Sequence, residues 1–188
     1  HVFRFFAKSS VQKSGIFAKN SAKKTMRELD RKFADKCNVK EYDDSIDFLR
    51  VDIPVSDGDY IKAGTLGFRA IDLPGHTRCS VGFYNEEEKL LLGTETLGVY
   101  DGEGGVVPSY LIGYAMTLAS ISKVQALELE QILVPHFGIL TGVEAWKYLS
   151  MARKAAVENK EFICERLRMG KSNAEIIEEM KKKFWHGY

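Results

Sequence analysis

Apolar positions along the chain follow two spacings, one typical of strands and one typical of helices. The segment LGFRAIDL at 66–73 alternates and is rich in β-forming residues, whereas QILVP at 131–135 is a continuous apolar run like that of a buried strand. Residues 21–36 carry apolar side chains at helical spacing behind Ser21, which is a suitable N-cap. The same patterns predict a short strand at 14–20, a hairpin with strands at 79–84 and 89–93, and helices at 108–122, 143–169 and 173–184.

Turn and cap residues separate these elements, and the mixture of strands and helices predicts the α/β (α+β) class. Pro108 is expected in the first helical turn of its segment, where its missing N–H costs nothing. Ser172 or Asn173 is expected to cap the last helix, and residues 2–9 are interpreted as a helix end or a loop. We therefore expect one domain over 1–141, in which strands alternate with helices, followed by a helical extension over 142–188.

Composition and charge narrow the classes of function. The 188 residues are 45% apolar and 28% charged, which is ordinary for a globular protein. With 27 basic and 26 acidic residues the net charge is +1, which gives no electrostatic reason to expect nucleic acid as a partner. We find no apolar run near the roughly 20 residues that span a bilayer and no signal peptide, so no membrane partner is expected. The three cysteines are widely spaced and lack a CxxC pair, which favours a reducing, cytoplasmic setting.

Three polar residues each follow the end of a predicted strand at a glycine-bearing turn: His76, Glu95 and His136. Each alone has an ordinary explanation, as an incidental turn histidine or a capping carboxylate. Strand ends on one edge of a sheet converge, however, and catalytic groups often lie on such loops. Two imidazoles and a carboxylate suit zinc, or iron or manganese. The pattern therefore favours a metal site at one sheet edge.

The sequence around these residues resembles motifs of the metallo-beta-lactamase superfamily. DGDYIKAGTLGFRAIDLPGHTRCSVGFY resembles the central segment of that family, with its acidic-Gly-Asp turn and Pro-Gly-His-Thr motif. KLLLGTETLG resembles the strand that ends in an acidic metal ligand, and ILVPHFG the strand that ends in the final histidine. The resemblance covers roughly residues 14–141. It implies a four-layer αββα sandwich, with N-terminal strands missing and the helical extension added.

The resemblance also implies roles for individual residues. His76 would bind the first of two divalent metal ions, Glu95 would bridge both, and His136 would bind the second. Thr77 would steady the turn through its hydroxyl. Glu95 replaces the usual aspartate of the family; placing Thr94 at that position is less favourable, because a hydroxyl is a poor bridging ligand.

The family's main motif, His-x-His-x-Asp-His, is absent from the sequence. His1 falls close to where its last histidine would stand, and we interpret it as a metal ligand, the alternative being a tag remnant or a chance residue. On this interpretation the chain starts at the end of the metal motif. It would then lack at least two ligands of the first metal and would not be expected to turn over by itself.

The function implied is a metal-dependent hydrolase that uses a metal-activated water on an ester, thioester, lactone or phosphodiester, with a small molecule as substrate. Zinc is the first expectation, with iron or manganese as alternatives. An iron-binding oxidoreductase related to flavin-diiron proteins is the second class, and a non-catalytic remnant that serves as a binding or dimerisation module is the third. An exposed sheet in a half-sandwich would need covering, so a homo-oligomer is left open. The 99–110 loop is expected to shape the substrate pocket, and Tyr100 and Tyr110 are either hydrogen-bond donors to a substrate oxyanion or ordinary packing aromatics.

Overall fold

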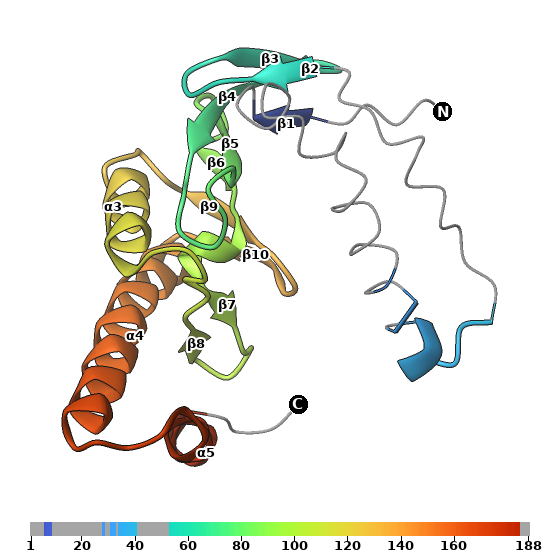
Figure 1. Ribbon diagram of the computed structural model, residues 1–188. Helices are drawn as coiled ribbons and strands as arrows, with labels where there is room; N and C mark the ends of the chain where they lie inside the picture. Colours follow the sequence, from blue (N-terminus) through green and yellow to red (C-terminus); the bar gives the residue numbers. More distant parts are fainter. Residues whose placement is uncertain (1–5, 9–27, 29–30, 33, 41–52, 185–188) are drawn as a thin grey trace. The chain divides into compact units, whose positions relative to one another are not determined.

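The computed structural model describes residues 6–8, 28, 31–32, 34–40 and 53–184 (Figure 1). The chain divides into two units, His1–Asp59 and Tyr60–Tyr188, which are treated separately. His1 and the strand predicted at 14–20 lie outside the described residues. Within the helix predicted over 21–36, the described residues Glu28, Arg31, Lys32 and 34–36 are helical.

The first unit contains a short parallel pair of strands. β1, Phe6–Lys8, pairs with β2, Ile53–Val55, with Phe6 opposite Ile53. The expectation of a helix end or a loop at 2–9 is therefore wrong for residues 6–8, because their conformation depends on a partner far along the chain. The predicted Asp57–Asp59 turn forms, with the backbone N–H of Ser56 donating to Asp59 Oδ2 at 2.7 Å.

The second unit is built on a mixed six-stranded sheet in the order β10-β9-β6-β5-β4-β3. β4, β5 and β6 form an antiparallel meander, and β6 then pairs in parallel with β9. β9 and β10 form an antiparallel hairpin around the turn at 135–137. The strands are β3 Tyr60–Ala63, β4 Leu66–Asp72, β5 Val81–Asn85, β6 Leu90–Leu92, β9 Gln131–Val134 and β10 Gly138–Thr141.

The second unit also contains three helices, a 3₁₀ turn and a small hairpin. α3, Tyr114–Gln125, and α4, Val143–Arg168, lie side by side (Figure 1). α5 spans Asn173–Phe184, and Ser172 is its cap: the Glu175 N–H donates to Ser172 Oγ at 3.4 Å, while the Glu175 carboxylate accepts from Ser172 N at 2.9 Å. Between β6 and α3 lie a 3₁₀ turn, η3, Glu95–Leu97, and a small hairpin of β7, Val99–Tyr100, with β8, Val106–Val107.

The core forms between one face of this sheet and the helices. Alternate residues of β9 show this directly: Ile132 and Val134 are buried, while Leu133 between them is 38% exposed. The buried cluster joins sheet residues to α3 and α4, and comprises among others Ile71, Tyr84, Leu91, Ile121, Val124, Ala145, Tyr148, Leu149 and Ala152. α4 thus packs directly on the sheet. The domain boundary expected between residues 141 and 142 stays a prediction.

One predicted helix needs correction, and several strands were not predicted. The helix expected at 108–122 begins only at Tyr114, because the N–H groups of Ile112 and Gly113 donate to the carbonyl of Gly75 instead of continuing a helical turn. The hairpin β7–β8 and the strand β10 were not predicted. The α+β class with a helical C-terminal part is confirmed. None of the helices in the described part of the chain combines the length and apolarity that a membrane span requires.

The alternation of β9 gives a direct test of the core. Replacing the fully buried Ile132 by alanine should lower the free energy of unfolding by about 2–5 kcal/mol, since the change leaves a cavity. Leu133→Ala on the opposite face is the matched control and should cost clearly less. Urea unfolding followed by circular dichroism measures both. Equal losses in the two variants would contradict the assignment of the faces.

Candidate metal site at the sheet edge

The ends of three strands meet at one edge of the sheet. β4 and β6 both run antiparallel to β5 and therefore parallel to each other, and β9 runs parallel to β6. The carboxyl ends of β4, β6 and β9 consequently share an edge. His76 follows β4, Glu95 follows β6 and His136 follows β9. The convergence that the sequence pattern suggested is a property of this topology.

His76 is the half-buried residue of a turn that is anchored on several sides. Its ring Nδ1 lies 2.9 Å from the carbonyl oxygen of Ser109 and 2.8 Å from Ser109 Oγ. When Nδ1 carries the proton, it donates to the Ser109 carbonyl and the lone pair stands on Nε2. This is the arrangement that orients metal-binding histidines in proteins.

Gly75 makes the turn before His76 compatible with its surroundings. Its φ is +151°, and a Cβ built on it would lie 2.2 Å from Thr117 Oγ1 and 2.7 Å from Thr96 Cγ2. Its carbonyl accepts from Ile112 N at 2.9 Å. The preceding residue is also fixed, because Ser120 Oγ of α3 donates to the Pro74 carbonyl at 2.7 Å. A side chain at position 75 would therefore push the histidine turn away from α3.

Glu95 opens the 3₁₀ turn η3, and the turn is capped by its neighbour. Thr94 Oγ1 accepts from Thr96 N at 3.3 Å, and Thr94 is buried. Thr94 is thus occupied as a cap, while the Glu95 side chain remains partly exposed at the edge. The Glu95 Oε1 atom lies 3.4 Å from His136 Nε2.

Thr96 joins the Glu95 turn to the His76 turn. Its hydroxyl donates to the carbonyl of Leu73 at 2.7 Å and accepts from the backbone N–H of His76 at 3.1 Å. The residue is fully buried. Both partners are backbone groups, and the Leu73 carbonyl belongs to a fully buried residue, where an unsatisfied acceptor is expensive.

His136 occupies an unusual backbone conformation. Its φ is +66°, in the left-handed region that few non-glycine residues adopt. The conformation belongs to the tight connection between β9 and β10, where Phe137 N donates to the Val134 carbonyl at 3.2 Å. The turn directs the largely exposed imidazole towards Glu95. Strain of this kind is often found at functional positions.

Aromatic side chains pack around the turns that carry Glu95 and His136. Tyr148 of α4 is fully buried, and its hydroxyl donates to the carbonyls of Leu97 at 3.0 Å and Gly98 at 2.8 Å. Burial raises the pKa of Tyr148, and the negative charge of Glu95 raises it further, so this hydroxyl stays neutral. Tyr100 stacks edge-to-face on Phe137, with ring centroids 4.6 Å apart, and on Tyr148 at 6.1 Å. Tyr100 is therefore in a packing position.

The structure brings together some of the expected ligands and leaves others apart. Glu95 and His136 are in contact, and His76 lies on the adjoining turn. Among the described residues, no group of three or more histidine, cysteine or carboxylate side chains is close enough to hold a metal ion. The chemistry of the donor set fits a divalent metal, with Nε2 of His76 left available by the Ser109 contact, but the described ligands are not gathered into a complete coordination sphere.

Three supporting residues were missed at the sequence level: Thr96, Ser109 and Tyr148. Thr96 and Ser109 gave no signal, because a hydroxyl in a loop has many roles and its partners here are remote in sequence. Tyr148 lies inside the helix predicted over 143–169, where a single tyrosine has no distinguishing signal. Thr77, in contrast, steadies the histidine turn as expected, with its Oγ1 at 2.8 Å from Ser80 Oγ.

The role of the Thr96 hydroxyl can be tested without changing side-chain shape. Thr96→Val should lower the free energy of unfolding by about 1–3 kcal/mol, because it removes the partner of two backbone groups, one of which is the carbonyl of the fully buried Leu73. Thr96→Ser keeps the hydroxyl and should recover most of that loss. Thr141→Val on the exposed β10 strand is the control and should stay within about 0.5 kcal/mol of the parent. A parent-like stability of Thr96→Val in thermal and urea unfolding would refute the link.

The conformation of His136 leads to a second prediction. Left-handed backbone costs an L-residue roughly 1–2 kcal/mol, so His136→Gly should be as stable as the parent or more stable by up to about 1 kcal/mol. His136→Val should be less stable, since a β-branched residue resists positive φ. Differential scanning calorimetry of the two variants measures the difference. A valine variant with the melting temperature of the glycine variant would show that the turn is not constrained in this way.

Known proteins resemble this chain in sequence over part of its length. No protein-family model matches the chain. Two curated relatives are hydroxyacylglutathione hydrolases: that of Nitrobacter winogradskyi is 41% identical over 71 residues, 37% of this chain and 27% of the relative. That of Nitrobacter hamburgensis is 34% identical over 101 residues, 53% of this chain and 37% of the relative. The chain thus spans well under half the length of these curated relatives.

Solved structures match over more of the chain. A metallo-beta-lactamase superfamily protein from Sulfolobus tokodaii superimposes with a TM-score of 0.54 at 19% identity, over 82% of this chain and 70% of that protein. A metallo-beta-lactamase family protein from Thermus thermophilus superimposes with a TM-score of 0.51 at 18% identity, over 88% of this chain and 54% of that protein. At these identities the likeness concerns the fold. The chain therefore has the fold of the metallo-beta-lactamase superfamily, and the resemblance found in its sequence motifs is confirmed.

Proposed function

We propose that this protein is a metal-dependent hydrolase that cleaves a small acyl substrate, with a thioester as the first candidate. The observation that carries the proposal is the contact of Glu95 with His136 at 3.4 Å, on a sheet edge to which the His76 turn is also fixed. The similarity to hydroxyacylglutathione hydrolases supports the thioester class. Zinc is the proposed metal, at two ions, and the cytoplasm is the proposed compartment.

The roles of the residues follow from their positions. A divalent metal bound at such an edge lowers the pKa of water and polarises a substrate carbonyl. His76 would bind through Nε2, because its Nδ1 is engaged by Ser109. Glu95 and His136, which contact each other in this structure, would instead contact a shared cation. His1 is proposed as a further ligand.

Two other functions remain as alternatives: an iron-binding oxidoreductase and a non-catalytic binding module. Both differ from the hydrolase in what the purified protein holds and does. An oxidoreductase would retain iron, and a module would bind no metal at the edge. Metal content therefore separates the three before any substrate is known.

Metal binding should depend on the three edge residues. We expect the purified, metal-stripped protein to take up zinc in equilibrium dialysis with elemental analysis, and His76→Ala, Glu95→Gln and His136→Gly each to weaken it. One lost ligand should reduce affinity by about tenfold or more, as loss of even an outer-shell partner does. Glu103→Gln, an exposed carboxylate of the following loop, is the matched control and should bind as the parent does.

Hydrolysis is the second measurement, made on the protein extended by His-x-His-x-Asp ahead of His1, because this sequence alone lacks at least two of the expected ligands. The zinc-loaded extended protein should cleave a hydroxyacyl thioester of glutathione faster than its metal-stripped form, and the three substitutions should abolish that difference. Unchanged zinc content in all three variants would overturn the site. Zinc binding without cleavage of a thioester, an ester, a lactone or a phosphodiester would overturn the hydrolase proposal and leave a metal-binding edge without this activity.

A further inference from the structure

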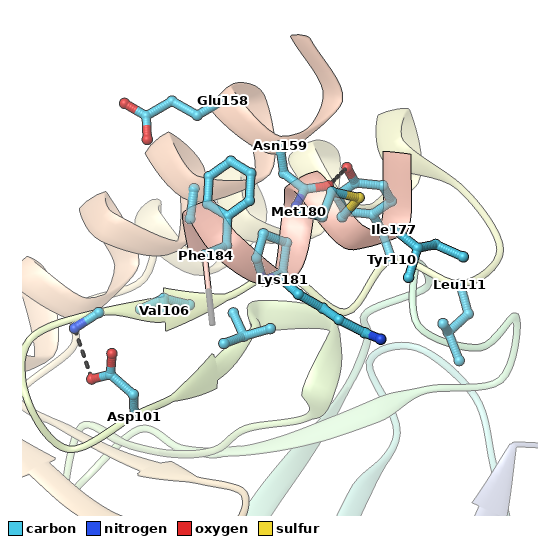
Figure 2. Close-up of a pocket in the computed structure, with 14 residues that line it drawn as sticks. Asp101, Val106, Tyr110, Leu111, Glu158, Asn159, Ile177, Met180, Lys181 and Phe184 are labelled. Atoms are coloured by element: carbon cyan, nitrogen blue, oxygen red, sulfur yellow. Dashed lines mark hydrogen bonds between the residues drawn. The ribbon is translucent and has the colours of Figure 1, made fainter. Parts of the chain in front are cut away.

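A cavity of about 440 Å³ lies beside the β7–β8 hairpin, under helices α4 and α5 (Figure 2). This volume is within the range of pockets that hold small molecules. The segment from β8 to residue 111 forms one wall, α4 forms the second and α5 the third. Most of its lining side chains are apolar, including Val106, Leu111, Ala155, Ile177, Met180 and Phe184.

Helix α5 is held over this cavity by charged pairs outside the lining and by a ring contact of Phe184, which lines the cavity. Glu179 accepts from Arg166 Nε at 3.1 Å and also pairs with Lys171, and the rings of Phe162 and Phe184 are 5.4 Å apart. The stripe formed by Ile177, Met180 and Phe184 has helical spacing and lines the cavity. Ile177 remains 50% exposed, and Leu111 across from it 73%. The cavity therefore offers apolar surface that the chain itself does not cover.

The charged side chains of the lining already have polar partners. Asp101 Oδ1 accepts from the N–H groups of Glu103 and Gly105, both at 2.8 Å. Lys181 donates to Glu178 at 2.7 Å, and Glu158 lies 3.7 Å from Lys154. A charged ligand would have to compete with these partners. The lining thus favours a neutral ligand.

One polar pair faces this apolar lining. Tyr110 donates its hydroxyl proton to Asn159 Oδ1 at 2.7 Å, the contact drawn as a dashed line in Figure 2. Asn159 is 8% exposed, and its Nδ2 group makes no hydrogen bond to the part of the chain that the structure describes. Burial raises the pKa of Tyr110 to about 12, so its hydroxyl is neutral at physiological pH. With its oxygen occupied, the amide of Asn159 is left with N–H donors, which suit a carbonyl oxygen.

We propose that this cavity binds the acyl chain of a neutral molecule, with the carbonyl of that chain accepting a hydrogen bond from Asn159 Nδ2. The hydrocarbon part lies along the α5 stripe, and the carbonyl lies at the Tyr110–Asn159 pair. This binding site goes beyond the proposed hydrolase function, because it requires neither metal nor turnover.

The cavity shares a wall with the candidate metal edge. Pro108 and Tyr110 line it, and Ser109 between them contacts the His76 ring. The acyl chain could therefore belong to the substrate of the proposed hydrolase or to a separate neutral ligand. Both sources present the same chemistry to the cavity.

Decanamide, a neutral ten-carbon amide, is the probe for the test. The full chain, kept metal-free with EDTA, is titrated by calorimetry and by displacement of the apolar dye N-phenyl-1-naphthylamine. We expect saturable binding of the amide at a single site and competition with the dye. Ala155→Leu fills the cavity from α4 and should weaken amide binding about tenfold or more, whereas Val157→Leu on the same helix lies outside the lining and should not.

The polar pair is tested by the double change Tyr110→Phe and Asn159→Leu, which removes both partners together. This variant should lose affinity for decanamide severalfold and keep its affinity for the dye. Circular dichroism melts establish that each variant is folded. Failure of decanamide to bind the folded parent, or parent-like binding by Ala155→Leu, would overturn the proposal.

The source of the acyl chain is then separated by kinetics of the zinc-loaded protein that has been extended by His-x-His-x-Asp ahead of His1. If the chain belongs to the substrate, Ala155→Leu raises KM for a decanoyl thioester and leaves that for an acetyl thioester unchanged. If it belongs to a separate ligand, both KM values stay unchanged while amide binding is lost. The metal-free titration stands by itself, so a failure of hydrolysis and a failure of this site are distinguishable.

Discussion

The arrangement of the candidate metal edge depends on the hydroxyl group of Thr96. β4 and β6 are not neighbours in the sheet, since β5 lies between them, so no sheet hydrogen bond can join the turns at their ends. Thr96 makes that connection. Its hydroxyl donates to the carbonyl of Leu73 and accepts from the backbone N–H of His76. Because the group is fully buried, water cannot replace it. A single side chain, which is not itself a proposed ligand, therefore joins the histidine turn directly to the glutamate turn.

A second layer of support comes from the helices. Ser120 of α3 fixes the Pro74 carbonyl, and Tyr148 of α4 fixes the end of the Glu95 turn. Both helices also fill the core on one face of the sheet, so the residues that position the edge are continuous with the residues that stabilise the fold. The core helices therefore support the edge. The β7–β8 hairpin supports it as well, because Tyr100 packs on Phe137.

The sequence allowed the layout of the fold to be predicted where the signal was local. β4, β9, α4 and the capped α5 were predicted within a few residues, because alternation, apolar runs and cap residues are written in consecutive positions. The late start of α3 was missed because Ile112 and Gly113 bind the carbonyl of Gly75, which is remote in sequence. β1 and β10 were missed for a similar reason: each is a short segment whose strand character comes from its pairing partner. The turn positions of His76, Glu95 and His136 were predicted, whereas their mutual distances and the supporting hydroxyl groups depend on tertiary contacts that no local pattern encodes.

The parallel pairing of β6 with β9 has a consequence for how the molecule assembles. The antiparallel strands β4 to β6 can form by local hairpin closure, but β9 must return across the whole segment from 93 to 130 before it reaches β6. That segment contains the Glu95 turn, the small hairpin and α3, so the entropy of closing it falls on the step that also brings His136 to Glu95. The edge is thus completed by one of the least local contacts in the unit. A nascent chain can therefore hold the meander while Glu95 and His136 are still apart.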